Sequence, residues 1–250
     1  MQRRHLGVQF SKHHRLAGVF PGAIDQTKPP GWSWHLGIMW FVSSPTPEDL
    51  ILAARCVRDC LGPAQDRDWS VPAGDLEWQC WRVLDHMAQA LSFYASHLAT
   101  RAPTRLAAVR IGAQDRPLAS PGEILEAIGS WAAILAAVAR SAPPDSRGFH
   151  SQGMADASGF LAMGCDELLI HTSDIGLGLD LDFVPPSGLA ARVRDRLFPW
   201  APPDVDPWDG LRWANGRLAL QEHQRLGPKW SWWCAPLAEW DGVPRSWSPR

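Results

Sequence analysis

Residues 76–100 read LEWQCWRVLDHMAQALSFYASHLAT, and their apolar side chains return every three or four positions. This periodicity is typical of an amphipathic helix. One face of that helix is marked by Val83, Met87, Ala90, Tyr94 and Leu98. With Asp75 as its N-cap, the stretch predicts a helix of about 25 residues, which is long enough to line a helical bundle.

The segment that follows, residues 101–119, contains Pro103, Gly112 and Pro117. Two adjacent antiparallel helices in a bundle need a connection of only about 2–8 residues. The length of this segment therefore predicts a crossover between the second and third helices of a bundle.

Helix start signals flank this long helix on both sides. Residues 46–49 (TPED) combine a capping side chain, a proline at the first helical position and two acids in the first turn, so a helix should run to about Leu61. Residues 120–123 (SPGE) form a capping box that should start a helix ending near Ala142.

A fourth helix is expected at residues 155–177, where Gly159 and Gly164 are interpreted as close-packing points rather than breaks. Four helices with one long crossover are typical of a bundle. Residues 46–178 therefore predict an all-α fold, a four-helix bundle.

Residues 179–250 change character and are interpreted as a small helical and extended segment packed on the bundle. A helix is expected at residues 187–198, and Asp206-Pro207 should start another. A strand or an extended strap is predicted by the tryptophans that follow, Trp230, Trp232, Trp233 and Trp240.

Residues 1–45 are expected to lie outside the bundle. Residues 1–38 carry five basic residues and one acid without sustained periodicity. One interpretation is an unstructured leader, although a transit peptide would need an amphipathic run and a cleavage site. The other is a translation start at Met39, which we favour because the first helix signal follows it closely.

Composition narrows the classes of partner. Lys and Arg number 24 against 26 Asp and Glu, so the attraction of a basic domain to nucleic acid or acidic lipid is not expected. The longest dense apolar run, residues 36–42, is far shorter than the roughly 20 residues of a bilayer span, which predicts no membrane partner. Five cysteines without a CxxC pair argue against a disulfide framework and favour a reducing cytoplasm.

The candidate chemistry lies in the fourth helix. Glu167 and His171 are four residues apart, so about 400° of rotation brings both onto one helical face. Phe160 and Gly164 share that face, which should point inward, where an unpaired carboxylate is strongly disfavoured. A positive group is therefore expected beside Glu167, and His86 of the second helix can supply a third ligand from a facing helix.

Two interpretations of these three side chains stay open. Two imidazoles and a carboxylate suit Zn²⁺, Fe²⁺ or Ni²⁺ and leave coordination positions for water or a substrate atom. Alternatively, His86 is an ordinary core histidine, and Glu167 and His171 form a helical ion pair. The spacing alone favours the second interpretation, because an isolated ExxxH pair is common.

Two segments together resemble a known family. Trp78 and His86 of the second helix, with residues 167–174 (ELLIHTSD) of the fourth, resemble the N-terminal domain of mycothiol-dependent maleylpyruvate isomerase, which belongs to the DinB/YfiT-like metal-binding bundles. The resemblance covers residues 46–178. It implies an up-down-down-up four-helix bundle, and it favours the metal site over the ion pair.

The resemblance also implies the ligands of a divalent metal ion. They correspond to His86, Glu167 and His171, with zinc as the first expectation and iron or nickel as alternatives. Asp174 matches the last acid of the motif and either orients a ligand from behind or is solvated at the helix end. Mycothiol is the implied thiol cosubstrate, and a small electrophile is the substrate.

Two departures from the family bear on the activity. Arg82 stands where the family has a small or acidic residue, and it either reaches an anionic substrate or covers the bundle surface, which we favour. Residues 179–250 are shorter than the family's second domain, although residues 211–217 resemble its Gly-Arg element.

We therefore expect a metal-dependent enzyme of the cytoplasm that activates a low-molecular-weight thiol, as a transferase or an isomerase. The alternative is a non-catalytic metal-binding bundle with an interaction or regulatory role, and the oligomeric state stays open.

Other candidate side chains are interpreted as structural. His150 lies several turns before the expected ligand pair, so a loop role is expected. His97 is eleven residues from His86, roughly 16 Å along the helix. Cys56 and Cys60 share one side of the first helix and are interpreted as small core residues.

Overall fold

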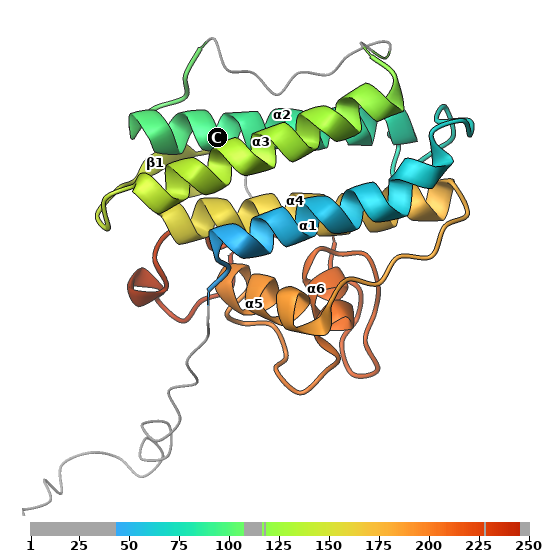
Figure 1. Cartoon of the computed structure of the whole chain (residues 1–250). Coiled ribbons are helices and arrows are strands. Elements are labelled where there is room, and N and C mark those ends of the chain that lie inside the picture. Colours follow the sequence, from blue (N-terminus) through green and yellow to red (C-terminus); the bar gives the residue numbers. More distant parts are fainter. Residues whose placement is uncertain (1–43, 108–116, 118, 228, 246–250) are drawn as a thin grey trace, which may run out of the picture. The chain divides into compact units, whose positions relative to one another are not determined.

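The computed structural model describes residues 44–107, 117, 119–227 and 229–245, and within them the fold is mostly helical (Figure 1). Contacts divide the chain into the units Met1–Trp40 and Phe41–Arg250, and the described residues belong to the second unit. The predictions of a leader and of a start at Met39 fall outside the described residues.

Six α-helices pack together in the described part of the chain, with two strands and two 3₁₀ turns between and after them. The helices are α1 (Pro47–Leu61), α2 (Cys80–Thr100), α3 (Pro121–Ser141), α4 (Ala157–Gly178), α5 (Ser187–Leu197) and α6 (Pro207–Ala214). The strands are β1 (Gly148–His150) and β2 (Gly153–Ala155), and the 3₁₀ turns are η1 (Gly62–Ala64) and η2 (Leu237–Glu239).

The first four helices lie side by side, and α1 and α2 each contact both α3 and α4. In Figure 1, α1 and α4 run in one direction, and α2 and α3 run in the other. Because α2 and α3 are neighbours that run the same way, the end of α2 and the start of α3 lie at opposite ends of this helix pair, as expected for a long connection. Its central residues, 108–116 and 118, lie outside the described part.

Capping determines where α1 and α3 begin. The Asp49 N–H donates to Oγ1 of Thr46 at 3.2 Å, and the Thr46 N–H donates to Oδ2 of Asp49 at 2.9 Å. Ser120 and Glu123 form the same reciprocal box at the start of α3. Each box satisfies two backbone donors that a helix start leaves without an intrahelical partner. Both predicted starts are confirmed.

The predicted start of the second helix is wrong, because α2 begins at Cys80 and Asp75 lies in the preceding loop. Within that loop the Ala73 N–H donates to the carbonyl of Trp78 at 2.9 Å. Gly74 adopts a φ of +58°, a left-handed conformation that glycine takes without steric cost. Backbone pairing in the loop thus replaces the helical turn that the apolar pattern suggests.

The helix that carries most of the candidate chemistry, α4, is enclosed. Sixteen of its 22 residues are buried, and it contacts α1, α2 and α5. A Cβ added at Gly164 would lie 3.1–3.3 Å from leucine side chains of α1, α2 and α3. A Cβ added at Gly159 would lie 2.1 Å from the carbonyl oxygen of Cys234. Both glycines are therefore close-packing points, as expected.

The C-terminal part forms an aromatic cluster beside α5. The ring of Trp230 has its centroid 5.9 Å from that of Phe198 and 5.8 Å from that of Trp232. The Trp233 N–H donates to the carbonyl of Leu197 at 2.8 Å. Residues 229–245 form no strand, so of the two alternatives it is the extended strap that the structure contains.

Arg196 fastens this strap to the start of α4. Its guanidinium is buried and donates to Oδ1 of Asp156, the N-cap of α4, at 2.6 Å and to Oγ of Ser158 at 2.7 Å. It also donates to the carbonyls of residues 233–235 at 3.0–3.3 Å. Charge-assisted bonds of this kind are stronger than neutral ones, so one side chain holds the strap in place.

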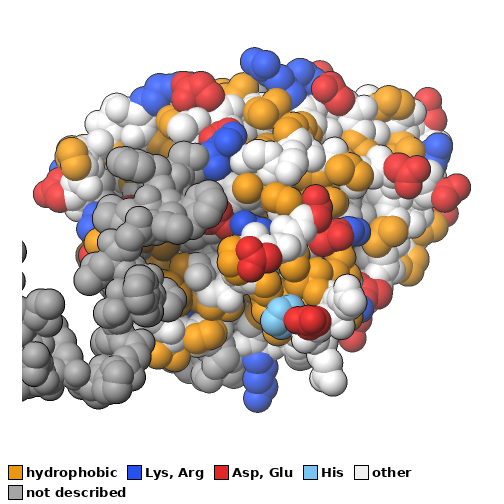
Figure 2. Space-filling model, turned by 90° about the horizontal axis from the view of Figure 1, so that it is seen from below, with side chains coloured by type: hydrophobic (Ala, Val, Ile, Leu, Met, Phe, Trp, Pro, Cys, Tyr) orange, Lys and Arg blue, Asp and Glu red, His pale blue; other side chains and the backbone are white. Residues whose placement is uncertain are grey.

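The face formed by α5, α6 and the C-terminal segment carries mixed charge. Figure 2 shows this side with hydrophobic side chains among basic and acidic ones. The arginines of α5 and α6 have acidic partners, in the pairs Arg192–Asp49, Arg194–Asp195 and Arg212–Asp209. Over its described residues this face therefore offers no basic patch of the kind that attracts nucleic acid.

A short antiparallel hairpin corrects the all-α expectation. β1 pairs with β2, and Phe149 lies opposite Met154. The Phe149 N–H also donates to the carbonyl of Ala102 at 2.7 Å, which attaches the hairpin to the end of α2. Strands of three residues are too short to show an alternating pattern, so no sequence pattern predicts them.

One helix, α3, is long and apolar enough to cross a membrane by length and composition alone. Its apolar run is interrupted by Glu126 and Ser130, so run length alone does not predict it. A single helix of this kind also occurs in the core of soluble proteins, although only 28% of the most apolar stretch of α3 is buried. In the structure α3 packs along α1 and α2.

Candidate metal centre

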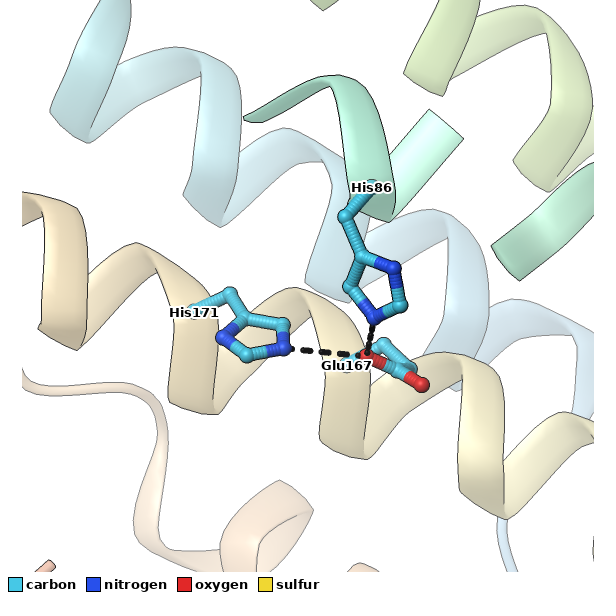
Figure 3. Close-up of side chains that lie close together, drawn as sticks. All are labelled: His86, Glu167 and His171. Atoms are coloured by element: carbon cyan, nitrogen blue, oxygen red, sulfur yellow. Dashed lines mark ion pairs between the residues drawn. The ribbon is translucent and has the colours of Figure 1, made fainter. Parts of the chain in front are cut away.

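Three side chains from two helices meet in the bundle (Figure 3). Nε2 of His86 on α2 lies 3.3 Å from Oε2 of Glu167 on α4, and Nε2 of His171 lies 3.2 Å from the same oxygen. The ligand atoms of the three residues all lie within 4.8 Å of one another. The structure therefore contains a His86–Glu167–His171 group that could hold a metal ion.

The distances suit ligands around one ion, and they also suit ion pairs between the carboxylate and the two imidazoles. Zn–N and Zn–O bonds of about 2.1 Å at a tetrahedral angle place the two ligand atoms about 3.4 Å apart. Hydrogen bonds between a charged N–H and a carboxylate are usually about 2.7–2.9 Å long. The observed 3.2 and 3.3 Å lie near the first value, and both imidazoles point their Nε2 atoms at one oxygen.

Burial and neighbouring charges act in opposite directions on the central carboxylate. The side chain of Glu167 is only 7% exposed, and burial alone would raise its pKa. The imidazoles of His86 and His171 outweigh this and hold the pKa well below its ordinary value. Glu167 is therefore ionised, as a ligand to a cation would have to be, and the two imidazoles lie beside it.

Asp174 lies behind His171, as the motif suggested. Its Oδ2 lies 3.0 Å from Nδ1 of His171, and its side chain is buried. Burial lowers the pKa of His171, but hydrogen bonds with Asp174 and Glu167 raise it to about 9. The alternative of a solvated residue at the helix end is wrong, because Asp174 contacts the ligand and not the solvent.

Arg217 anchors Asp174 from the C-terminal segment. Its Nε donates to Oδ1 of Asp174 at 2.8 Å, and its Nη2 donates to Oδ2 at 2.9 Å. This paired arrangement sets the position of the carboxylate as well as its charge. The element at residues 211–217, noted only for its resemblance, thus reaches the back of the candidate site.

His86 is held differently from His171. Its ring packs edge-on against Trp78, with centroids 5.5 Å apart, and against His171 at 5.3 Å. Its Nδ1 is buried and has no hydrogen-bond partner among the described residues. Arg82 stacks on the indole ring of Trp78, with its guanidinium carbon 4.3 Å from the ring centroid. Arg82 therefore covers the indole that supports His86.

Two further side chains of the site were not expected. The hydroxyl of Tyr94 donates to Oε1 of Glu167 at 2.8 Å, although the sequence had assigned Tyr94 to the apolar stripe. Asp166 accepts bonds from Nδ2 of Asn215 at 2.8 Å and Nε1 of Trp232 at 2.9 Å. Burial raises the pKa of Asp166 to about 7 despite these donors. The sequence feature that could have identified Asp166 is its position next to Glu167 on a helix expected to be buried.

The other histidines within the described part of the chain do not join the group. His150 belongs to β1 rather than to a loop, and it is buried beside Tyr94 and Trp232 at centroid distances of 5.8 and 5.6 Å. Burial lowers its pKa to about 4. His97 is buried, with Nδ1 bonded to the carbonyl of Phe93 at 2.8 Å, so its role is structural as expected.

The two α1 cysteines are half-buried rather than core residues. Cys56 and Cys60 are both partly exposed, and burial raises the pKa of each thiol. Side chains of α1 that do lie in the core include Leu50, Ala53 and Val57. The prediction of a core position is therefore wrong for Cys56, whereas Cys60 packs against the core without being fully buried in it.

A pocket of about 550 Å³ lies between the loop before α2 and the C-terminal segment, and its lining includes none of His86, Glu167 and His171. Its lining includes Arg217, Arg225, Gln152, Trp230 and Trp232. Asp75 and Leu76 of the loop complete the opposite wall, and Asp75 forms an ion pair with Arg225. Arg217 thus belongs both to the pocket wall and to the chain of bonds that ends at His171.

Comparison with known proteins identifies no similar protein. No family model matches the sequence, and neither a curated protein nor a solved structure is significantly similar to it. The activity and fold family implied by the resemblance in the two motif segments therefore belong to the proposal that follows.

Proposed function

We propose that this protein is a divalent-metal-dependent enzyme that activates a low-molecular-weight thiol, of the mycothiol type, for transfer to a small electrophile or for its isomerisation. Zinc is the proposed ion, with Fe²⁺ or Ni²⁺ as alternatives that the same donor set suits. The proposal places the protein in the cytoplasm, within the DinB/YfiT-like bundles of up-down-down-up arrangement. Its partners are small molecules and not nucleic acid or membrane.

One observation carries the proposal. The Nε2 atoms of His86 and His171 both point at Oε2 of Glu167, at 3.3 and 3.2 Å. Three protein ligands leave room at a four-coordinate ion for a water or substrate atom, which is the pattern of catalytic zinc sites. The imidazole side chains are 19% and 15% exposed, so the group is reachable from outside the core.

The side chains around the group support a catalytic use. A divalent cation held there would act as a Lewis acid and lower the pKa of a thiol. Because a carboxylate only accepts hydrogen bonds, Asp174 would keep a proton on Nδ1 of His171, so that a cation displacing the proton from Nε2 could bind there. Arg217 keeps Asp174 in that position through two hydrogen bonds.

The pocket supports binding of a small organic ligand. Its volume of about 550 Å³ lies within the range of about 300–1,000 Å³ usual for such sites. Trp230 and Trp232 offer apolar faces, and Gln152 offers an amide. Arg217 and Arg225 each pair with an acid, so the wall has polar groups without a large excess of charge.

The alternative is a non-catalytic metal-binding bundle with an interaction or regulatory role. The Trp-rich strap supports it, since a docked aromatic segment can stabilise a fold without any chemistry. The two proposals differ in thiol turnover and agree on metal binding.

The test begins with protein purified without chelator. Elemental analysis should find about one divalent ion per chain, as a three-ligand site predicts. Incubation with mycothiol and a panel of electrophiles should then give conjugates or isomerised product. The His86→Ala variant should lose both the ion and the product.

His223→Ala is the matched control, because His223 is exposed and lies in the C-terminal segment. It should keep metal and turnover. Metal without turnover in the wild-type chain would favour the non-catalytic alternative. Protein without stoichiometric metal would reject both and leave Glu167 in ordinary ion pairs with the two histidines.

A further inference from the structure

Tyr94 reaches the same carboxylate as the two imidazoles. It lies two helical turns beyond His86 on α2, about 12 Å along the axis. Helical side chains lean toward the N-terminus of their helix, which carries the phenol of Tyr94 back toward His86. Its buried hydroxyl donates a hydrogen bond of 2.8 Å to Oε1 of Glu167.

The two oxygens of Glu167 therefore have separate partners. Oε1 accepts the phenol hydrogen, whereas Oε2 lies 3.3 and 3.2 Å from Nε2 of His86 and of His171. A carboxylate can bind a cation through one oxygen or through both. Here the hydrogen bond occupies Oε1, and Oε2 alone faces the imidazoles.

The phenol ring is fixed by its neighbours. Tyr94 is 1% exposed, and the ring centroids of Phe93, His150 and Phe160 lie 6.0, 5.8 and 5.8 Å from its own. A side chain enclosed on these sides cannot swing its hydroxyl away from Glu167 without disturbing the core. The hydrogen bond is thus in place before any ion arrives.

We infer that Tyr94 is a positioning residue that makes Glu167 a one-oxygen ligand and so keeps coordination positions of the ion open. The inference rests on the metal site of the proposed function. Without the phenol, Oε1 would be a buried acceptor lacking a partner, which is costly. Binding the cation with both oxygens would then satisfy Oε1 and fill a position that substrate needs.

The test compares the wild-type chain with Tyr94→Phe after each is loaded with one equivalent of Co²⁺. The visible d–d absorption of Co²⁺ weakens as its coordination number rises. At equal cobalt content we expect Tyr94→Phe to show a loss of molar absorption relative to wild type. Equal absorption in the two loaded proteins overturns the inference. A wild-type chain that takes up no Co²⁺ refutes the proposed metal site, and the inference falls with it.

Phe160→Leu is the matched control, because it removes one of the rings packed on Tyr94 but keeps the phenol hydroxyl, and Phe93 and His150 still enclose the ring. Its cobalt spectrum should equal that of the wild type. A spectrum like that of Tyr94→Phe would mean that ring packing, and not the hydrogen bond, controls the coordination, and it would overturn the inference.

A second measurement needs no substitution at the site. Tyr94 is the single tyrosine of the 250-residue chain, so protein grown with 3-fluorotyrosine gives one ¹⁹F resonance. One equivalent of Zn²⁺ should shift that resonance, because the cation draws electron density from the carboxylate that accepts the phenol hydrogen. A resonance that stays in place while zinc is bound overturns the inference, even where Tyr94→Phe does not fold.

Discussion

In mild acid the free energy of unfolding of the wild-type protein should decrease because of His150, and replacing His150 by asparagine should prevent this part of the decrease. His150 is buried between Tyr94 and Trp232, and its Nδ1 accepts the backbone N–H of Gln152 at 3.3 Å. Burial, and less strongly the charges of His97 and Arg105, lower its pKa from 6.5 to about 4, against an opposing effect of Glu167. The folded protein therefore keeps this imidazole neutral.

The direction of the pH effect follows from that pKa. As pH falls below 6.5, the unfolded chain takes up a proton on this histidine, whereas the folded chain does so only near pH 4. Stability is therefore present above pH 6.5 and declines as pH falls toward 4. At about 1.4 kcal/mol per pKa unit the full loss is about 3.5 kcal/mol, and about 2 kcal/mol of it has occurred by pH 5.

Urea unfolding in the presence of EDTA at pH 7.5 and at pH 5 measures this contribution. Between the two pH values the wild-type free energy of unfolding should fall by about 2 kcal/mol more than that of His150→Asn. Asparagine keeps an acceptor for the Gln152 N–H but has no proton to gain. Carboxylates titrate alike in both proteins, and His223→Asn, at an exposed position, should behave as wild type. Equal pH dependence in wild type and His150→Asn would refute the reasoning.

Three other substitutions test the contacts around α4. Asp174→Asn should weaken zinc binding about 10–100-fold, because the imidazole of His171 loses its charged hydrogen-bond partner. Competition with a chelator measures the zinc affinity, and an unchanged affinity would contradict the prediction. Arg196→Met should lower the free energy of unfolding by about 2–3 kcal/mol, since the half-buried carboxylate of Asp156 and three carbonyls lose their donor; a cost below 1 kcal/mol in urea unfolding would contradict it. Gly159→Ala should destabilise by about 1–3 kcal/mol through its clash with the strap, whereas Gly129→Ala, where a Cβ meets nothing within 4 Å, should stabilise by up to about 1 kcal/mol. Thermal unfolding compares this pair, and equal effects at both glycines would disprove the clash.

Local signals in the sequence were sufficient for the parts of the fold that local chemistry controls. The capping residues of α1 and α3 act within four residues of each other, so Thr46 with Asp49 and Ser120 with Glu123 could be recognised directly. The same holds for Glu167 and His171, whose spacing of one turn decides that they share a face.

Contacts between distant segments were beyond the reach of such patterns. Arg217 meets Asp174 from 43 residues further along the chain, in a segment without regular periodicity. Tyr94 has the spacing of a core residue on α2, and only the packing of α2 against α4 brings its hydroxyl to Glu167. The early start predicted for α2 failed for a related reason, because backbone bonds of the loop outweigh helical preference there.

The enclosure of α4 has a consequence for how freely the chain can vary. A helix at the surface tolerates substitutions at its exposed positions, which recur every three or four residues. In contrast, α4 is packed against other parts of the protein around most of its circumference. Saturation mutagenesis should therefore record a nearly continuous band of intolerance along α4, and a periodic one along α3, whose outer side is open. Substitutions accepted in evolution or in a designed library would then lie mainly at the surface of the protein, while the sequence of α4 changes little.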